Sequence, residues 1–166
     1  MTASVVERFY FEDVVLHGVL ETPGITLTQA HVMLYAGLGG EPPGDPESIP
    51  DLLPLFLSTG LGWRVPQPPL AVLAFLGLEW NVIRPARVGD TIHSRSRTVV
   101  KRAMREGGVV IEEREMIDQR GETLQRGRFT FLVARREATP SIPGRGSRLA
   151  EGAADRVLDF RLRRIP

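Results

Sequence analysis

Four carboxylates lie close together in a loop rich in proline and glycine. Residues 39–50 read GGEPPGDPESIP and Asp51 follows, so the loop carries Glu41, Asp45, Glu47 and Asp51. A carboxylate whose pKa is raised by burial can move protons to and from a substrate, which makes Asp45 and Glu41 candidates for general acid–base catalysis. The alternative is that these side chains are solvated, the common state of a carboxylate in such a loop.

Histidine is the other residue type suited to proton transfer near neutral pH, and the chain has three. His31 lies in a predicted helix and could face a cleft as a third catalytic candidate. The alternative for His31 is a helix-capping or partly buried side chain. His17 and His93 are most simply surface residues. None of the three has a partner at the spacing that zinc sites use, so no metal site is predicted.

Composition narrows the class of protein. The chain has 166 residues, of which 42% are hydrophobic, enough for one compact core. Its formal net charge of +1 disfavours a nucleic-acid or membrane partner. It has no cysteine, which excludes disulfides and thiolate catalysis. The N-terminus lacks a signal-peptide pattern and no stretch is long and apolar enough to span a bilayer, so we expect a cytoplasmic protein.

The second half of the chain reads as a meander of antiparallel strands. Alternating apolar and polar residues predict strands at residues 78–83, 91–102, 109–118 and 123–134. Turn-forming residues at 106–108 and 119–122 separate the last three strands, as in hairpins.

The first half reads as helical. Residues 26–38 predict a helix with a hydroxyl cap and an end at Gly39, and Asp51 caps a shorter one over residues 51–57. Residues 69–78, PLAVLAFLGL, are apolar all round, which predicts a helix enclosed by protein. The predicted fold is α+β: an antiparallel sheet wrapped around this central apolar helix.

Three segments carry a family resemblance. They are Tyr10-Phe11-Glu12-Asp13, then residues 21–30 (ETPGITLTQA), and residues 78–91 (LEWNVIRPARVGDT) with the turn Asp118-Gln119-Arg120-Gly121-Glu122. In their order and spacing they resemble the MaoC-like hydratases and dehydratases, which have the hot-dog fold. The resemblance covers roughly residues 9–136. It implies one hot-dog domain over residues 1–136, with residues 137–166 as a partly irregular C-terminal extension.

The same resemblance implies a ligand and an assembly. The ligand is an acyl chain held as a thioester on coenzyme A or on a carrier protein, with no other cofactor. The assembly is a homodimer or higher homo-oligomer formed through sheet edges, where unpaired backbone groups can meet a second copy.

The catalytic motif of the family is altered in this chain. Active members carry Gly-Asp-x-Asn-Pro-x-His after the first helix, and the Asp and His act together. Counting forward from the helix places Gly40 at the Asp and Asp45 at the His. Counting backward from residues 58–62 places Pro50 at the His. Neither register supplies a histidine. The two registers differ by about five residues, which predicts a short insertion in this loop.

The family also carries Ala-His-Gly at the start of the enclosed helix, where backbone N–H groups receive the thioester oxygen. This chain has Val65-Pro66-Gln67-Pro68-Pro69-Leu70 before its predicted helix. Proline has no N–H, so the remaining donors are Gln67, Leu70 and Ala71.

Side chains beside the expected cleft could contact the ligand. Arg84 and Arg87, with Arg95 and Arg97 further along, could meet the phosphates of coenzyme A, because the planar guanidinium suits phosphate. Solvated arginines on a sheet face are the alternative. Trp63 could line the pocket, although packing is the simpler role for both Trp63 and Trp80.

Three functions remain open. The first is an enoyl-thioester hydratase or dehydratase, a lyase, whose site is rebuilt in the loop from Glu41 to Asp51. The second is a catalytically inactive subunit that binds an acyl thioester or pairs with an active paralogue. The third, and weaker, is an acyl-CoA thioesterase.

Overall fold

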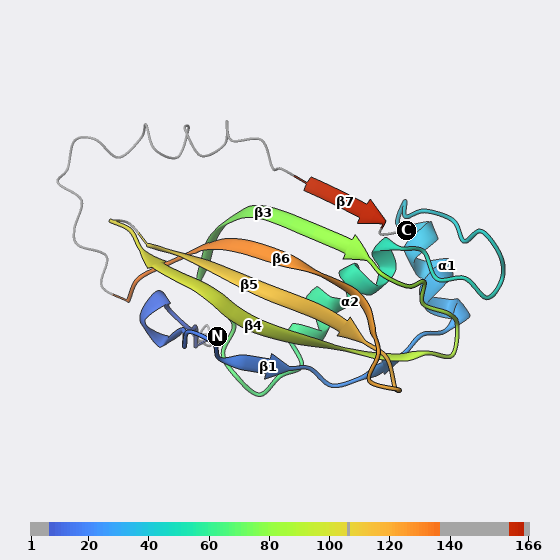
Figure 1. The fold of residues 1–166 in the computed structure, drawn as a ribbon, viewed down its shortest axis with the longest axis horizontal. Helices are drawn as coiled ribbons and strands as arrows, with labels where there is room; N and C mark the ends of the chain where they lie inside the picture. The colour runs from blue at the N-terminus through green and yellow to red at the C-terminus, as the bar shows by residue number, and fades with distance from the viewer. Residues whose placement is uncertain (1–6, 106, 137–159, 165–166) are drawn as a thin grey trace, which may run out of the picture.

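Long antiparallel strands dominate the molecule. The computed structural model describes residues 7–105, 107–136 and 160–164. Its strands are β1 (Val19–Glu21), β2 (Ile25–Thr26), β3 (Val72–Val82), β4 (Thr91–Ala103), β5 (Gly108–Ile117), β6 (Thr123–Val133) and β7 (Phe160–Arg164). They form a sheet in the order β1-β4-β5-β6-β3-β7, with β2 also paired to β4 (Figure 1).

The meander predicted from residue alternation is confirmed. β4, β5 and β6 follow one another as antiparallel neighbours, and β6 pairs antiparallel with β3. The predicted strand at residues 78–83 is the second half of β3. β7 is the one strand of this path that runs parallel to its neighbour. It belongs to the predicted C-terminal extension, most of which lies outside the described residues.

The helices are a short 3-10 helix η1 (Phe11–Asp13), α1 (Gln29–Gly37) and α2 (Leu52–Gly62). α1 matches the helix predicted before Gly39. α2 begins where the shorter helix was predicted but continues to Gly62. Asp51 precedes it as expected, although the side chain of Asp51 makes no capping hydrogen bond.

The prediction of a helix enclosed by the sheet is confirmed, but the segment assigned to it was wrong. Residues 69–78 are not helical, since β3 begins at Val72; the enclosed helix is α2, which runs along one face of the sheet (Figure 1). Leu53 and Leu61 of α2 are both 2% exposed. A short apolar run suits a buried helix and a buried strand equally well, which explains the error.

The core lies between α2 and the inner face of the sheet. Trp80 of β3, Ile92 of β4 and Met116 of β5 are fully buried there. A buried amide secures the start of α2 to this core: the Trp80 Nε1–H donates to Gln125 Oε1 at 2.9 Å, and Gln125 Nε2 donates to the carbonyl of Asp51 at 2.8 Å. The sheet therefore holds the N-terminus of α2 in place.

The edge of β3 is covered along part of its length. β7 pairs with residues 78–82, while the segment from Val72 to Gly77 has no strand on that side among the described residues. This open segment is apolar and solvent-exposed, with Leu73 56% and Leu76 41% exposed.

No helix in the described part of the chain is long and apolar enough to cross a membrane.

Candidate functional site

The predicted site residues separate into two groups at opposite ends of α2. The loop with Glu41 and Asp45 leads into the N-terminus of this helix, whereas Trp63 and Gln67 follow its C-terminus. Eleven helical residues rise about 16 Å. The sequence suggested one site, but the structure has two regions: an acidic loop and a groove.

The groove lies beyond the end of α2, where the helix no longer covers the inner face of the sheet. Its volume is about 580 Å³. The end of α2 and the segment after it contribute Thr59, Gly62, Trp63, Gln67 and Leu70. The predicted ligand contacts Trp63, Gln67 and Leu70 therefore do line a cavity, while Ala71 and the two candidate arginines Arg84 and Arg87 are not part of its wall.

An aromatic cluster forms one wall of the groove. The ring of Phe129 lies 5.9 Å from those of Phe75 and Phe131, centre to centre, and 5.8 Å from that of Trp80. Cavities walled by aromatic rings suit apolar ligands because they remove aliphatic surface from water. The groove is thus suited to an aliphatic chain.

Four polar side chains interrupt this apolar wall, and we call them the polar quartet: Ser96, Thr98, Glu112 and Arg114. They form a block on the inner face of β4 and β5, where Ser96 lies opposite Arg114 and Thr98 opposite Glu112. Arg114 Nη2 donates to Glu112 Oε2 at 3.0 Å, and its guanidinium carbon lies 4.3 Å from the centre of the Phe129 ring. The quartet was not anticipated from the sequence, although Glu112 and Arg114 break the apolar alternation of the strand on the face that holds Val110 and Met116.

The acidic loop is ordered around Asp45. The Asp45 carboxylate accepts the N–H of Glu47 at 2.8 Å through Oδ1, and Oδ2 has no hydrogen bond to another described residue. Ser48 closes the turn: its Oγ accepts the N–H of Asp45 at 3.1 Å and donates to the Asp45 carbonyl at 3.0 Å. Asp45 is exposed, with one carboxylate oxygen available for chemistry.

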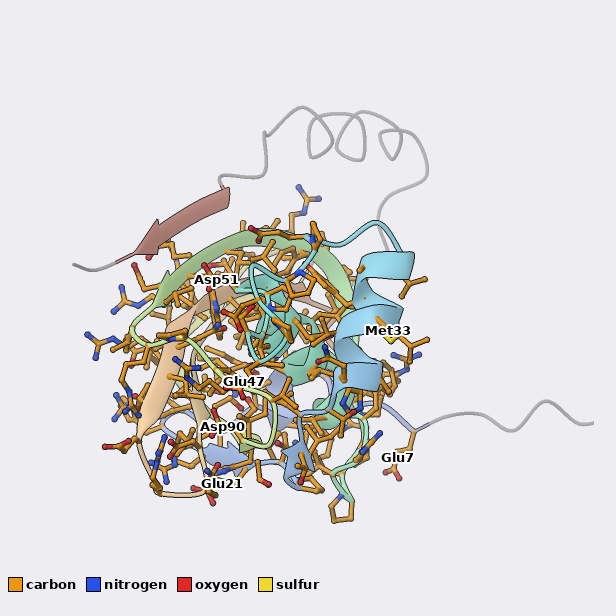
Figure 2. The ribbon with its side chains drawn as sticks, turned by 90° about the vertical axis from the view of Figure 1, so that its right-hand side faces the viewer. Glu7, Glu21, Met33, Glu47, Asp51 and Asp90 are labelled. Carbon is orange, nitrogen blue, oxygen red and sulfur yellow. The ribbon has the colours of Figure 1, made fainter. Side chains whose placement is uncertain are left out.

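The loop is attached to the segment before β4. The N–H of Val88 donates to the carbonyl of Glu47 at 3.0 Å, and the N–H of Ile49 donates to that of Ala86 at 3.3 Å. Ile49 is 4% exposed and joins the core. Figure 2 views this end of the molecule, with Glu47 labelled between Asp51 and Asp90. The position of Asp45 is thus set by the fold.

One of the two motif registers also matches the first residues of the motif. If Pro50 stands at the histidine of Gly-Asp-x-Asn-Pro-x-His, then Gly44 and Asp45 stand at its Gly-Asp, because the Asp precedes the His by the same spacing. A comparison of the two registers for the histidine alone misses this match. In that register a carboxylate stands at the position of the motif's Asp and a proline at that of its His.

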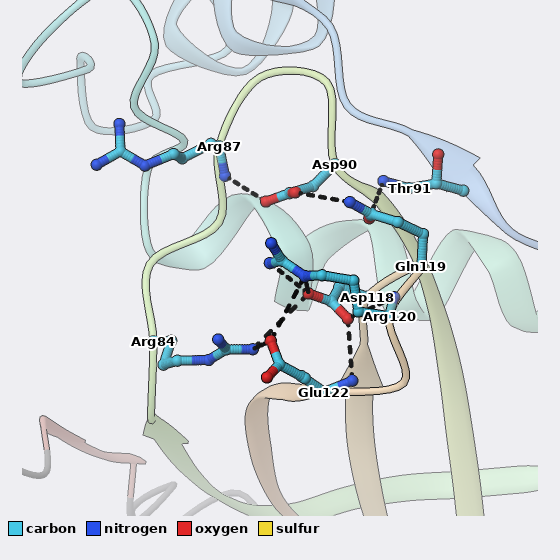
Figure 3. Close-up of polar contacts among 8 residues, drawn as sticks. All are labelled: Arg84, Arg87, Asp90, Thr91, Asp118, Gln119, Arg120 and Glu122. Carbon is cyan, nitrogen blue, oxygen red and sulfur yellow. Dashed lines mark hydrogen bonds and ion pairs between the residues drawn. The ribbon is translucent and has the colours of Figure 1, made fainter.

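Two of the segments that carry the family resemblance, the turn before β4 and the β5–β6 hairpin turn, are joined by hydrogen bonds. Asp90 accepts the N–H of Arg87 at 2.9 Å and the Nε2–H of Gln119 at 3.2 Å, while Gln119 Oε1 accepts the N–H of Thr91 (Figure 3). These contacts join the turn before β4 to the β5–β6 hairpin turn. They hold the segment before β4, to which the acidic loop is attached.

Asp118 is the centre of the hairpin turn. Its buried carboxylate accepts the N–H groups of Arg120 and Glu122, both at 2.9 Å, and two bonds from the Arg120 guanidinium. Burial acts to raise the pKa of Asp118, but the hydrogen bonds from Glu122 and Arg120 outweigh it, so the pKa lies below its usual value of 3.8. The carboxylate is therefore a structural anion.

His31 forms a capping box with Thr28 at the start of α1. Its Nδ1 lies 3.1 Å from the backbone nitrogen of Thr28, whose N–H it accepts, and 3.0 Å from Thr28 Oγ1. Accepting an N–H requires an unprotonated Nδ1, which places the ring proton on Nε2. The capping alternative is thus what the structure shows, and a catalytic role for His31 stays a prediction.

Tyr35 is a residue near the loop that sequence reasoning missed. Burial, followed by the negative charge of Glu41, raises the pKa of its hydroxyl. It therefore stays protonated and can donate a hydrogen bond in the vicinity of the loop. The sequence offers one indication that Tyr35 lies near the loop: it follows His31 by four residues on the same helix, shortly before the loop begins.

The expectation that Gln67, Leu70 and Ala71 supply amides at a helix N-terminus is wrong. This stretch leads into strand β3, and two of the amides are already used: the N–H of Gln67 donates to Val65 at 2.8 Å and that of Ala71 to Phe9 at 2.7 Å. The enclosed helix is α2, and its N-terminus directly follows the acidic loop.

The arginines proposed for phosphate binding are engaged with carboxylates. Arg84 lies 2.6 Å from Glu122, and Arg87 forms a looser, exposed pair with Glu47 at 3.7 Å. Arg95 and Arg97 pair with Glu21 and Glu113 at 2.6 and 3.1 Å. Of the four, Arg87 is the one whose side chain is two-thirds exposed, and its contact with phosphate remains a prediction.

Comparison with known proteins finds structural relatives but no sequence match. Neither a family profile nor a curated protein matches the chain. An Archaeoglobus structure described as a monoamine oxidase regulatory protein aligns with a TM-score of 0.69 at 23% identity, covering 78% of this chain and 97% of that one. A putative MaoC domain protein dehydratase from Chloroflexus aurantiacus aligns with a TM-score of 0.68 at 23% identity, covering 86% of this chain and 45% of that one.

A third relative is a Mycobacterium tuberculosis protein described as having a double hot-dog fold. It aligns with a TM-score of 0.64 at 21% identity over 81% of this chain and 47% of that one. Other matches are MaoC-like dehydratases and R-hydratases. At these identities the likeness establishes the fold: the chain has the predicted hot-dog fold, with α2 as its enclosed helix. It spans about half the length of the Chloroflexus and Mycobacterium chains.

Proposed function

We propose that the chain is a MaoC-like acyl-thioester hydratase or dehydratase in which Asp45 is the acid–base residue. The observation that supports it most is the placement of Asp45. It stands at the spacing of the family carboxylate, in a loop attached to the sheet, directly before the helix whose first amides face the thioester in the family.

One carboxylate can carry the whole reaction. In hydration of an enoyl thioester, the ionised carboxylate takes a proton from water as the hydroxyl oxygen bonds to C3. The carboxyl group then returns a proton to C2, so the atoms of one water molecule are added across the double bond. The positive end of α2 stabilises negative charge that develops on the thioester oxygen. Dehydration is the same sequence reversed.

Following the enoyl absorbance of crotonyl-CoA tests this proposal. We expect the purified chain to consume the enoyl group and Asp45→Asn to reduce kcat at least about a hundredfold, the usual contribution of general acid–base catalysis. Glu47→Gln is the matched control, an exposed carboxylate of the same loop, and it should retain activity. Absence of turnover in the wild-type chain contradicts the proposal.

A second candidate is a binding subunit that completes a pair of hot-dog units. Pro50 in place of the family histidine favours it, and the relative described as having a double hot-dog fold is a precedent for such pairing. If thioesters raise the melting temperature of the wild-type chain without turnover, this candidate is supported. Release of free coenzyme A from crotonyl-CoA would instead indicate a thioesterase.

We also propose that the chain forms a homodimer through the open segment of β3, from Val72 to Gly77. Exposed apolar side chains and an unpaired strand edge lie in the same place among the described residues. They support this proposal because exposed apolar surface is costly in water and unpaired backbone groups can pair with a strand of a second copy. The double hot-dog relative contains two such units in one chain, a precedent for pairing.

A further inference from the structure

The polar quartet presents both a donor and an acceptor to the groove. Arg114 donates to Glu112 through Nη2. Its Nη1 makes no hydrogen bond to a described residue and is not fully buried. The same holds for Oε1 of Glu112. One cationic N–H and one carboxylate oxygen of this pair therefore remain accessible in the wall of the groove.

A charged pair in this position is unexpected for a structural role. Both side chains are 15% exposed, and Arg114 Nε is buried without a hydrogen-bond partner. Taking two charges out of water costs free energy that such a pair recovers only when its remaining polar atoms are satisfied. The remaining polar atoms of Arg114 and Glu112 make no hydrogen bond to a described residue. A ligand that bonds these atoms would therefore add hydrogen bonds to the pair.

The chemistry of the pair selects the ligand group. Since Arg114 and Glu112 neutralise each other, an added carboxylate or ammonium would leave a net charge in a low-dielectric cavity. A hydroxyl group is neutral, accepts from Arg114 Nη1 and donates to Glu112 Oε1 at once. The hydroxyls of Ser96 and Thr98 lie opposite on β4 and make no hydrogen bond to described residues, so they can join the same contact.

We propose that the groove binds an aliphatic chain that carries a hydroxyl group, and that the polar quartet recognises this hydroxyl. The aromatic wall around Phe129 receives the chain. Because the groove lies at the end of α2 opposite to Asp45, this hydroxyl is distinct from the one formed or lost at C3. That the chain is part of an acyl thioester rests on the proposed function.

Three probes of equal chain length separate the possibilities. 1-Octanol offers a donor and an acceptor, octanoate offers acceptors and a negative charge, and octylammonium offers donors and a positive charge. We expect isothermal titration calorimetry on the full chain to give a Kd for 1-octanol at least about tenfold below those for the two ions, the effect of one hydrogen bond to a charged group. Equal affinities, or tighter binding of octanoate, would overturn the proposal.

The double variant Glu112→Gln/Arg114→Met should raise the Kd for 1-octanol about tenfold, the effect of losing a hydrogen bond to a charged group. It should keep the fold, because replacing both members of a buried pair is often neutral or stabilising. The control is Arg97→Met/Glu113→Gln, which removes an exposed pair from the outer face of the same two strands. The control variant should keep the wild-type Kd for 1-octanol. An unchanged Kd in the Glu112/Arg114 variant would show that the quartet does not recognise the hydroxyl.

The outcome is separable from that of the proposed function because the probes contain no thioester. If crotonyl-CoA is not turned over but 1-octanol is preferred, the proposed function fails and the hydroxyl site stands. If turnover is observed and no preference exists, the hydroxyl site fails alone.

Discussion

At the scale of single residues, carboxylates in this protein differ sharply in what surrounds them. Asp118 is buried within a set of N–H donors, whereas Asp45 is exposed with one oxygen unbonded. The first arrangement stabilises a fixed charge, and the second leaves a carboxylate oxygen open to solvent. Residue type alone could not separate these two settings; their hydrogen-bond partners do.

The low pKa of Asp118 predicts a specific dependence of stability on pH. A folded-state pKa below the ordinary 3.8 means that ionisation stabilises the fold above about pH 4, and this stabilisation is lost as pH falls through the folded-state pKa. We expect Asp118→Asn to lower the free energy of unfolding at neutral pH, and the deficit relative to wild type to shrink below about pH 4.

Urea unfolding at a series of pH values measures this effect. Glu115→Gln is the control, since Glu115 forms no ion pair with a described residue and its loss should leave the pH dependence unchanged. A deficit for Asp118→Asn that stays constant down to about pH 2 would contradict a stabilising charge at this position.

At the scale of elements, the sequence allowed the sheet to be predicted better than the helix it encloses. Residues 91–134 alternate clearly and end in recognisable turns, so β4, β5 and β6 were predicted almost to the residue. α2 and the start of β3 are both apolar runs with little periodicity. The three-dimensional packing of α2 against Trp80 and Met116 decides between them, and that contact is not visible in the sequence.

The candidate site was predictable only in part. The acidic loop was identified because its carboxylates stand out among prolines and glycines. Trp63 and Gln67 were identified and both line the groove. Gln67 was chosen for the wrong reason, because it follows a helix and does not begin one. The polar quartet depends on the register of β4 against β5, which brings Ser96 beside Arg114. Long-range pairing of this kind cannot be derived from spacing along the chain.

Gln125 is expected to control the stability of the start of α2. Gln125→Leu would leave the N–H of Trp80 buried without an acceptor, which costs about 1–3 kcal/mol. Denaturant unfolding should show this loss, and hydrogen exchange should be faster in the first turn of α2. Gln119→Leu, which removes an exposed amide of the hairpin turn, should cost less. Equal losses would argue against a special role for the buried amide.

Gly127 is expected to tolerate no side chain. A Cβ at this position in β6 would overlap the carbonyl oxygen of Glu79 and the Trp80 ring on β3. Gly127→Ala should therefore destabilise the protein by about 1–3 kcal/mol or more. Gly77→Ala is the matched control on the paired strand, where nothing lies near the added atom, and it should be neutral or stabilising by up to about 1 kcal/mol. Thermal unfolding of both variants tests this difference.

At the scale of the whole molecule, the open segment of β3 predicts the assembly. We expect light scattering to give the mass of a dimer for the wild-type chain and of a monomer for Leu73→Lys/Leu76→Lys, since charges on an edge strand oppose pairing. Neither leucine lines the groove. Met33→Lys, which alters an exposed apolar residue of α1, should leave the dimer intact. A monomeric wild-type chain would contradict this assembly.

The separation of the acidic loop from the groove by the length of α2 has an evolutionary consequence. Substitutions in the quartet could change the proposed ligand preference without altering Asp45, the proposed acid–base residue, and Asp45 could be lost while the groove stays intact. The two proposed properties can therefore change through independent substitutions.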